Sequence, residues 1–400
     1  MKIKIEKLDH FGRGICYVDG KICFVEDTLP GEVVDIKNTL EKKKFLLGKV
    51  NDFYKVSNDR IDEVCPYKDK CGGCDLSHLK YEKENEYKCL KVKELMSKYG
   101  NVSSDLVMDC VYGDEYNYRN KVTLHGERNL IGYYKKNSND IVPIKKCLLV
   151  DEKINIIIDK LNKMDYHNNY DEVIIKCSND SEEVMISITG EVRDYEELFN
   201  FCDSLIINGK VVKGEESIVS FIGKCKYEIT DKGFFQVNKN LTKLLYDEVR
   251  NVVGLVKPKR VLDLYCGAGT IGIYISDLVD EVIGVEVFED SIFLANRNKE
   301  LNNIKNISFI NDKVENVIDK INDNIDFVIV DPPRSGLDNK TIDVLLNMEV
   351  KDIVYVSCDP VTLARDIKLL SDKYEVCYIK PFNMFSRTYH VENVCYLKLK

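Results

Sequence analysis

The chain has 400 residues, 44% of them hydrophobic and 31% charged, a length and composition that can bury two or three separate cores. Its opening Met-Lys-Ile-Lys-Ile-Glu is too charged for a signal peptide and no apolar run reaches the length of a membrane span, so we expect a cytoplasmic protein with no membrane partner. The net charge of -9 argues against a uniformly basic nucleic-acid-binding protein, although a local basic face is compatible with it. The 15 cysteines of such a chain indicate free thiols, metal ligands or a nucleophile rather than disulfides.

Residues 1–57 alternate apolar and polar side chains between glycines, which predicts a small β-barrel. Asp19-Gly20 separates two such runs and is a hairpin signal. Residues 1–60 hold 12 Lys and Arg against 10 Asp and Glu, so this end is slightly basic in an acidic chain. That balance suits a surface that touches RNA, and it equally suits an ordinary solvated surface. Through residues 11–13 and 29–32 the segment resembles the TRAM domain, an OB-like RNA-binding module.

Three cysteines, Cys65, Cys71 and Cys74, lie within ten residues beside the flexible pair Gly72-Gly73. A structural zinc site usually takes two close pairs of ligands, whereas here one close pair has one outlier and the fourth ligand is distant. This spacing favours an iron–sulfur cluster, with zinc as the second interpretation and inert clustered thiols as the third. The chemistry alone leaves Cys89, Cys110 and Cys147 open as the fourth ligand.

Residues 58–235 are predicted to form a central α+β domain. A charged helical stretch over 80–99, which we expect to pack on the last domain, precedes alternating runs at 131–134 and 172–175 that are typical of an antiparallel sheet. Arg119 and Lys121 lie beside tyrosines, so they are candidates for stacking on RNA and neutralising it. Decoration of an edge strand is the commoner explanation of such residues.

Residues 236–400 alternate strands and helices, which predicts a parallel, doubly wound, Rossmann-like sheet. The first turn of this region, residues 263–272, contains the glycine fingerprint that lets a backbone approach a nucleotide. Glu286 ends the next strand, where a carboxylate can accept hydrogen bonds from ribose hydroxyls. Both features serve NAD and S-adenosylmethionine alike. Asp331-Pro332-Pro333-Arg334 follows the fourth strand, and this turn favours an S-adenosylmethionine-dependent methyltransferase that acts on a base.

Cys358 lies between an apolar run at 353–356 and a helical pattern at 361–367, at the edge where open α/β proteins bind ligands. The amino terminus of a helix lowers the pKa of a thiol, so we expect Cys358 to be readily ionised. A lone cysteine at a strand end is more often a packing residue. The surrounding motifs give Cys358 its weight.

Taken together, these motifs resemble the RNA uracil-C5 methyltransferase family, in particular the 23S rRNA 5-methyluridine enzymes that carry a TRAM domain and an iron–sulfur cluster. The resemblance rests on the four cysteines, residues 235–238, 263–272, 331–336 and 357–366, and His390-Val391-Glu392. It implies Cys358 as nucleophile and Glu392 as general base. It also implies a [4Fe-4S] cluster on Cys65, Cys71, Cys74 and Cys147. The residues that would contact the methyl donor are Gln236, Tyr265, Gly267, Glu286 and Asp331.

Uracil chemistry supports the same assignment. C5 of uracil is a poor nucleophile, so a thiolate must first add to C6, and a base must later remove the C5 proton. An unpaired or extruded uridine in RNA is the expected substrate, and the cluster is expected to be structural or to position RNA. No obligate protein partner is evident.

Three alternatives remain open. A tRNA T-loop uridine methyltransferase would share the chemistry, although the barrel and the cysteines favour 23S rRNA. An exocyclic-amine methyltransferase would not need Cys358. An RNA-binding protein with a degenerate transferase domain would not bind the methyl donor.

Overall fold

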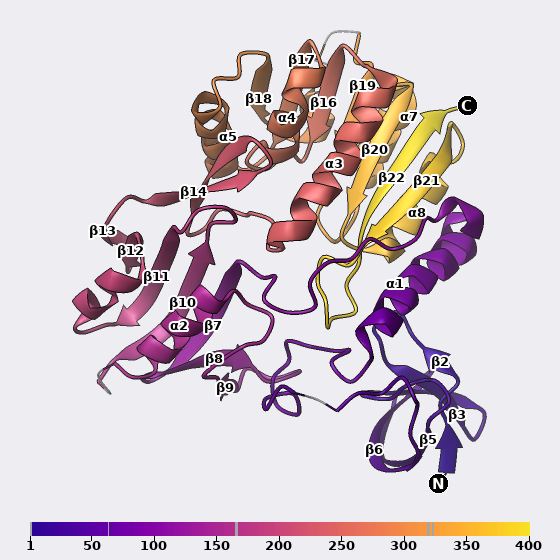
Figure 1. The fold of residues 1–400 in the computed structure, drawn as a ribbon. Coiled ribbons are helices and arrows are strands. Elements are labelled where there is room, and N and C mark those ends of the chain that lie inside the picture. Colours follow the sequence, from indigo (N-terminus) through magenta and orange to yellow (C-terminus); the bar gives the residue numbers. More distant parts are fainter. Residues whose placement is uncertain (1, 63, 165–166, 318–320, 322–323) are drawn as a thin grey trace.

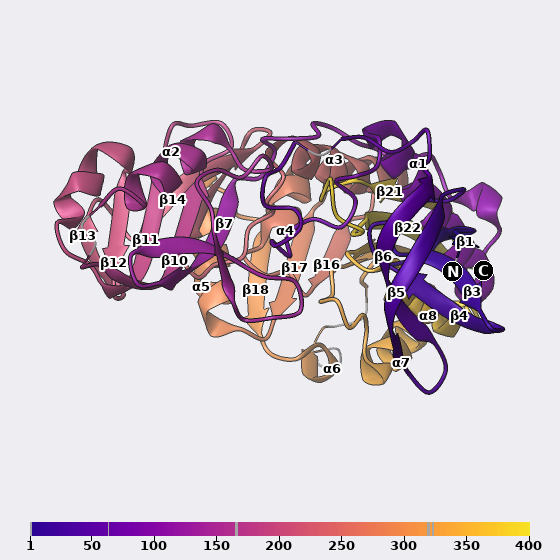
Figure 2. The same cartoon turned by 90° about the horizontal axis from the view of Figure 1, so that it is seen from below.

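The structure, a computed structural model, describes residues 2–62, 64–164, 167–317, 321 and 324–400. Three large sheets carry most of the chain (Figure 1). In Figure 1 the central sheet lies at the lower left and the amino-terminal sheet at the lower right, both below the carboxyl-terminal sheet, and Figure 2 shows the same two sheets at opposite ends of the molecule. Residues 56–62 and 64–80, here called the cysteine segment, contain three of the predicted cysteine ligands. This segment contacts both the amino-terminal and the central sheet regions, because Lys68 pairs with Asp27 and the Gly72 amide donates to the Tyr134 carbonyl.

The amino-terminal sheet has six strands in the order β1-β5-β6-β4-β3-β2. They are β1 (Lys2–Lys4), β2 (Lys7–Leu8), β3 (Gly14–Val18), β4 (Lys21–Val25), β5 (Val33–Glu41) and β6 (Leu46–Lys55). The predicted hairpin is confirmed, because β3 pairs antiparallel with β4 and both turn residues, Asp19 and Gly20, have positive φ angles of 48° and 78°. Two-residue hairpin turns need such backbone angles.

Helix α1 (Tyr81–Leu95) follows and continues into a wider helical turn, η1 (Met96–Gly100). A 3-10 turn, η2 (Ser104–Leu106), comes next. Val92 and Met96 pack into the core on one face of the carboxyl-terminal sheet. The inward face of α1 also holds Glu84 and Lys88, whose side chains are completely buried. Burying these charges requires polar partners in the body of the protein.

The central sheet has seven strands in the order β13-β12-β11-β10-β7-β8-β9. They are β7 (Lys121–Glu127), β8 (Leu130–Tyr134), β9 (Ile141–Pro143), β10 (Asn169–Cys177), β11 (Val184–Glu191), β12 (Ser204–Ile207) and β13 (Lys210–Lys213). The predicted antiparallel pairing is found between all neighbours except β11 and β12, which run parallel because the 3-10 helix η3 (Tyr195–Phe201) crosses between them. Helix α2 (Glu152–Leu161) packs its apolar side chains into the core of this sheet.

A separate hairpin, β14 (Ser217–Ile222) and β15 (Cys225–Thr230), connects the central sheet to the carboxyl-terminal domain. Its Ile222 and Tyr227 share a core with Leu245 of helix α3 (Lys239–Val256). This hairpin therefore packs with the carboxyl-terminal domain.

The carboxyl-terminal sheet has the order β18-β17-β16-β19-β20-β22-β21. Its strands are β16 (Arg260–Leu264), β17 (Glu281–Glu286), β18 (Ile307–Asn311), β19 (Phe327–Val330), β20 (Asp352–Ser357), β21 (Tyr374–Phe382) and β22 (Glu392–Leu399). The helices between them are α4 (Thr270–Ile275), η4 (Ser276–Leu278), α5 (Glu289–Leu301), α6 (Val314–Val317), α7 (Asn339–Met348) and α8 (Pro360–Leu370).

The first five strands of this sheet are parallel, as predicted for a doubly wound sheet, and all of them except the edge strand β18 are buried on both faces. Neighbouring residues such as Val261 and Leu262 belong to the cores on opposite faces. β22 is antiparallel to β20, and β21 completes that edge. The strand order reverses between β16 and β19, and open α/β sheets bind ligands in the crevice at such a point. Among the described residues, no helix has the length and apolar character needed to span a membrane.

Candidate active site

The carboxyl edge of the parallel strands brings residues from separate motifs together. β16 pairs with β19, with Leu264 beside Val330 as the last pair. Tyr265 and Asp331 therefore leave the sheet at the same level, and the Asp331 amide donates a hydrogen bond of 3.3 Å to the Leu264 carbonyl. The glycine turn and the Asp-Pro-Pro-Arg turn thus meet at the reversal of strand order.

The antiparallel pair β20 and β22 determines the relation between the predicted nucleophile and the predicted base. Its last pair joins Ser357 to Asn393. One step further in the same register, Cys358 stands opposite Glu392. Side chains of directly opposed residues in an antiparallel pair project from the same face. Two residues that are distant in the sequence therefore share one side of the sheet edge.

The pKa of Cys358 differs from our expectation. Burial, together with the carboxylates of Glu392 and Asp331, raises it to about 12 against the opposing guanidinium of Arg334. The prediction of a thiol made acidic by the helix terminus is wrong, because burial and two carboxylates outweigh the helix that begins at Pro360. A bound cation would reverse part of this effect and favour the thiolate.

Three carboxyl groups lie at this edge, and of these residues Asp263 and Glu392 are buried and Asp331 is partly buried. Burial and the charge of Asp331 raise the pKa of Asp263 to about 8 and that of Glu392 to about 8, and burial raises the pKa of Asp331 to about 7. Asp263 accepts a hydrogen bond from the Gly272 amide through Oδ2 at 3.1 Å, whereas its buried Oδ1 has no partner among the described residues. A buried carboxylate oxygen without a donor is suited to a cationic or hydrogen-bonding ligand.

The glycine turn leaves space next to the backbone of Gly267. This residue has a φ of 53°, and no atom lies within 4 Å of the position that a Cβ would take. Gly269, in contrast, packs its backbone against Phe309, where a Cβ would meet ring carbons at 2.6 Å. The turn is thus packed on its inner side and open at Gly267, as a nucleotide-binding turn must be.

Tyr265 and Glu286 border the same turn. Tyr265 has a φ of 61°, and its hydroxyl lies 3.0 Å from Thr341 Oγ1. Glu286 Oε2 accepts a hydrogen bond of 3.2 Å from the Gly267 amide, and its Oε1 accepts from the amides of Val287 and Phe288. The open glycine, the acidic edge and the unpaired Asp263 oxygen fit S-adenosylmethionine, which carries a sulfonium cation and an ammonium group.

Gln236 lies on the segment that leads into α3. Its backbone carbonyl accepts a hydrogen bond of 3.1 Å from the side chain of Asn120, and Val237 pairs with Asn120 through the backbone. Gln236 lines a cavity that it shares with the four predicted cysteine ligands and with Arg334. Asn238 begins α3 as its N-cap and donates a hydrogen bond of 3.0 Å to the Met384 carbonyl.

This cysteine cavity has a volume of about 500 Å³. Cys65, Cys71, Cys74 and Cys147 all line it. Its charged lining, as far as the chain is described, is entirely cationic and consists of Lys68, Arg119, Lys121, Lys146 and Arg334. The structure thus brings the three clustered cysteines together with Cys147. The other candidates lie outside this lining, because the Cys89 thiol contacts the Met108 carbonyl and the Cys110 thiol contacts the Val111 carbonyl.

The four thiols line one cavity, but in the described residues no three His, Cys, Asp or Glu side chains lie close enough together to hold one metal ion. Both zinc and iron–sulfur clusters take four cysteine ligands, so the donor set is compatible with either group.

Comparison with known proteins agrees with this geometry. A family model described as tRNA (Uracil-5-)-methyltransferase matches residues 211–400, and a TRAM domain model matches residues 1–50. A protein of Halalkalibacterium halodurans named as an uncharacterized RNA methyltransferase is 32% identical, over 100% of this chain and 97% of its own length. One of the same description from Clostridium acetobutylicum is 34% identical, over 99% of this chain and 96% of its own. The chain belongs to the RNA (uracil-5-)-methyltransferase family.

A solved structure supports the same conclusion over the whole fold. The Pyrococcus abyssi tRNA (uracil-54, C5)-methyltransferase, in complex with S-adenosyl-L-homocysteine, superposes with a TM-score of 0.79 and 26% identity. The match covers 99% of this chain and 100% of the other. The protein is thus an RNA methyltransferase that uses S-adenosylmethionine, and RNA is its substrate.

Sequence reasoning missed a polar network around the loop of residues 383–391, which connects β21 to β22 in this methyltransferase. Glu84 and Lys88 of α1 form an ion pair of 2.9 Å with both side chains fully buried. Lys88 also donates to Asn383 Oδ1 at 2.5 Å, and Glu84 accepts from the backbone amide of Arg387 at 3.0 Å. The spacing of Glu84 and Lys88 is that of a surface ion pair on a helix, so the sequence gave no signal of their burial.

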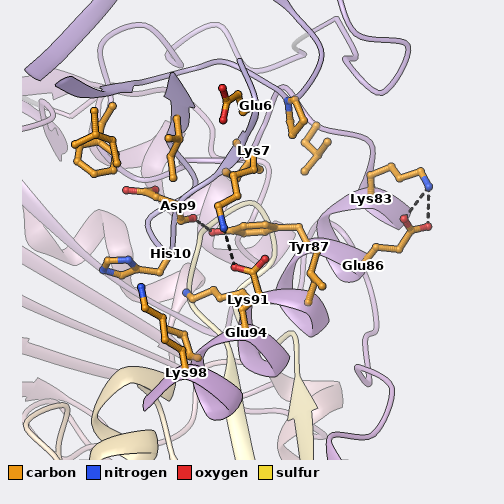
Figure 3. A pocket seen from close by; sticks show the side chains of 18 of the residues that line it. Glu6, Lys7, Asp9, His10, Lys83, Glu86, Tyr87, Lys91, Glu94 and Lys98 are labelled. Atoms are coloured by element: carbon orange, nitrogen blue, oxygen red, sulfur yellow. Dashed lines mark hydrogen bonds and ion pairs between the residues drawn. The ribbon is translucent and has the colours of Figure 1, made fainter. Parts of the chain in front are cut away.

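A second cavity, of about 550 Å³, lies between the TRAM sheet and α1 (Figure 3). Lys7 pairs with Glu94 across it, and the Tyr87 hydroxyl donates to the Asp9 carbonyl. Its lining mixes four lysines with five carboxylates. This balance is unlike the uniformly cationic lining of the cysteine cavity and does not suit a phosphate backbone.

Proposed function

We propose that this methyltransferase transfers a methyl group to C5 of a uridine in 23S rRNA through a covalent adduct between Cys358 and C6 of the base. The observation that carries the proposal is the register of β20 and β22, which sets Cys358 opposite Glu392 beside Asp331. These are the two groups that methylation at C5 requires, a nucleophile and a base on one side of the target ring.

The residues act in a fixed order. The Cys358 thiolate adds to C6, forming a sulfur–carbon bond and moving the electron pair of the C5–C6 double bond toward C5. Bound S-adenosylmethionine supplies an electrophilic sulfonium methyl group to that carbon. Glu392 then takes the C5 proton, and the electrons left behind restore the double bond and expel the thiolate.

The acidic edge would hold the methyl donor. Gly267 gives the cofactor room, Glu286 and Tyr265 border it, and Asp331 places a carboxyl group beside the reacting centre. Gln236 would line the methyl-donor site as well, and it also lines the cysteine cavity together with Arg334. A cation among these carboxylates also favours ionised Cys358, so binding of the methyl donor and activation of the nucleophile are linked.

The four cysteines would hold a [4Fe-4S] cluster. The reaction has no redox step, so we assign the cysteines a structural role in ordering the segment beside the RNA cavity. Cations around this cavity would serve both thiolates and RNA phosphates. An RNA substrate agrees with the cytoplasmic location expected from the sequence.

A tRNA uridine is the second candidate substrate. The observation in its favour is the likeness to the Pyrococcus abyssi tRNA enzyme along 99% of this chain. That match includes the amino-terminal sheet. The presence of the TRAM domain therefore does not distinguish an rRNA enzyme from a tRNA enzyme, contrary to our expectation that it favours 23S rRNA.

The test uses anaerobically purified protein with labelled S-adenosylmethionine and unmodified transcripts of 23S rRNA and of tRNA. We expect 5-methyluridine at one or more positions of 23S rRNA with the native protein and none with Cys358→Ala. A matched control is Cys377→Ala, a half-buried thiol on β21 that should leave the rate unchanged. Label in tRNA alone would show that the substrate is tRNA and not 23S rRNA. Label that survives Cys358→Ala, or that appears on an exocyclic amine, would exclude the covalent mechanism.

A further inference from the structure

The loop of residues 383–391 ends at the proposed base, and it has an unusual environment for a loop. It leaves the sheet after β21 and returns at Glu392, the first residue of β22 (Figure 1). Asn383, Ser386 and Arg387 are all buried. A buried loop without regular structure needs partners for its backbone polar groups from other parts of the protein.

Those partners come from widely separated segments. The loop carbonyls accept hydrogen bonds from Asn238 at Met384, from Lys88 at Phe385, from Tyr118 at Ser386, from Asp75 and Leu76 at Arg387, and from Lys91 at Tyr389. Most of these donors precede residue 211, where the match to the methyltransferase family model begins. The approach of the chain to Glu392 is therefore determined by α1 and by the cysteine segment.

Arg387 is the residue on which this network converges. The residue is 1% exposed, and its backbone has a φ of 67°, a left-handed conformation that costs energy in any residue other than glycine. The guanidinium donates to the Leu79 carbonyl at 2.5 Å, lies 3.6 Å from Glu84 and forms an ion pair with Glu115. Its backbone carbonyl accepts from the Asp75 and Leu76 amides at 2.9 and 3.0 Å.

Such a network is a costly way to obtain stability alone. Buried ion pairs recover little more than the cost of removing their charges from water, and apolar residues of similar volume often stabilise a protein equally well. The Nη1 and Nη2 nitrogens of Arg387 have partners, whereas its Nε has none among the described residues. A buried polar network with this many partners favours a single conformation. Four residues lie between Arg387 and Glu392, and Glu392 pairs with Phe382 at the other end of the same loop. The loop is held at both ends and at Arg387.

We propose that Arg387 is a positioning residue for the proton-abstraction step, because it fixes the 383–391 loop between Glu84 of α1 and the cysteine segment and so sets the place of Glu392. This inference rests on the proposed function. It adds a requirement that residues 75–91 hold the base in place, although they belong to neither the TRAM model nor the methyltransferase model.

The order of the chemical steps gives this role a specific signature. Addition of Cys358 and transfer of the methyl group do not use Glu392. When the base is displaced, the reaction stops with the sulfur–C6 bond intact and with both a methyl group and a proton on C5. Release requires that the proton leave, so that its electron pair can expel the thiolate. A displaced base therefore accumulates a methylated covalent complex of protein and RNA.

The experiment compares Arg387→Lys and Glu84→Gln with native protein, with Glu392→Gln as the benchmark for a missing base. Arg260→Lys and Glu281→Gln are the controls, since they alter an ion pair of 2.6 Å at the amino-terminal end of the sheet, opposite the site. RNA transcripts that the native protein methylates are mixed with labelled S-adenosylmethionine. The kcat, the KM for RNA and the fraction of label in a complex resistant to denaturation are then measured.

We expect kcat to fall by about 100-fold in Arg387→Lys, with the KM for RNA changing by less than about threefold, because a small displacement of a catalytic group acts on the rate rather than on binding. The complex should accumulate as in Glu392→Gln, and S-adenosylmethionine binding should match the native protein. The control variants should turn over normally without trapped complex.

The possible failures are distinguishable. Loss of activity in Arg387→Lys and Glu84→Gln without trapped complex, or together with loss of S-adenosylmethionine binding, would mean that the network only supports the fold and would overturn the inference. Turnover equal to that of the controls would overturn it as well. If Glu392→Gln itself traps no complex, the proposed covalent function fails and this inference fails with it.

Discussion

Two neighbouring regions of this methyltransferase gather different ionisable side chains. The edge of the parallel sheet gathers the carboxyl groups of Asp263, Asp331 and Glu392, and each has a raised pKa. The cysteine cavity has a cationic lining instead. Arg334 belongs to both, since it lines the cysteine cavity and lowers the pKa of Glu392 and Cys358. The two environments match two different ligands, a sulfonium cation and polyanionic RNA.

This difference shows why the net charge of the chain was a weak guide to its partner. The overall charge of -9 argued against an RNA coat, yet the lysines and arginines that matter gather on one cavity. The carboxyl groups come from the ends of separate strands and meet only through the sheet. The ionisable groups of the acidic edge and of the cysteine cavity are therefore brought together by the fold and not by any one segment of the chain.

The largest effect should come from the cysteine cavity. Cys74→Ser removes one of four thiolates, and we expect anaerobically purified protein to lose nearly all bound iron, inorganic sulfide and visible absorption. Cys89→Ser is the control, because Cys89 lies outside the cavity lining and its variant should keep the full iron content. Measurement of iron and sulfide per chain decides the matter. Equal iron content in both variants, or stoichiometric zinc in the native protein, would show that these cysteines do not hold an iron–sulfur cluster.

The sequence allowed much of this fold to be predicted, because strands such as β17 and β19 are continuous apolar runs with turn signals at their ends. The three cysteines at 65–74 could also be grouped from the sequence, because they lie close together in the chain. Cys147 could be joined to them only through the family resemblance, and the structure now places it on the same cavity. Local patterns were readable, whereas long-range pairing was not.

Two features of the site were beyond a single sequence. The register of β20 and β22 sets Cys358 opposite Glu392, yet no local pattern links two residues 34 positions apart. The burial of Arg387 and Glu84 was equally hidden, because charged residues are ordinarily exposed and α1 resembles a solvated helix. The pKa of Cys358 was predicted in the wrong direction because the helix terminus was visible in the sequence and the surrounding carboxylates were not.

The acidic edge of the sheet and the cysteine cavity should respond separately to the removal of a charge. Asp331→Asn should raise the Kd for S-adenosylmethionine by about 10- to 100-fold, since a charge-assisted contact is lost, and should leave RNA affinity unchanged. Lys121→Gln should weaken RNA binding by up to about tenfold, reduce the salt dependence by about one phosphate contact and leave S-adenosylmethionine binding unchanged. Titration of both ligands against both variants at two salt concentrations tests this. If either variant changed the binding of both ligands, the acidic edge and the cysteine cavity would have to act as one site.

The smallest expected effect is on stability, and it concerns Glu392 at the acidic edge of the sheet. The folded pKa of Glu392 is about 8, above its ordinary value of 4.5, so the folded state holds the proton more tightly than the unfolded state. The free energy of unfolding contributed by Glu392 is then fully present below pH 4.5 and is lost as pH rises through 8.

Glu392→Gln cannot lose that proton, and its Tm should therefore exceed that of the native protein by about 3 °C at pH 9, with a smaller difference at pH 5. Glu349→Gln is the control, because Glu349 is exposed and Lys373 lowers its pKa, so its variant should show no such gain at alkaline pH. Saturating S-adenosylmethionine should shrink the advantage of Glu392→Gln, since a bound cation favours the native carboxylate. A Tm difference that is the same at both pH values would mean that Glu392 is already ionised at neutral pH without its ligand. The acidic edge would then be charged before the cation arrives rather than ionised by it.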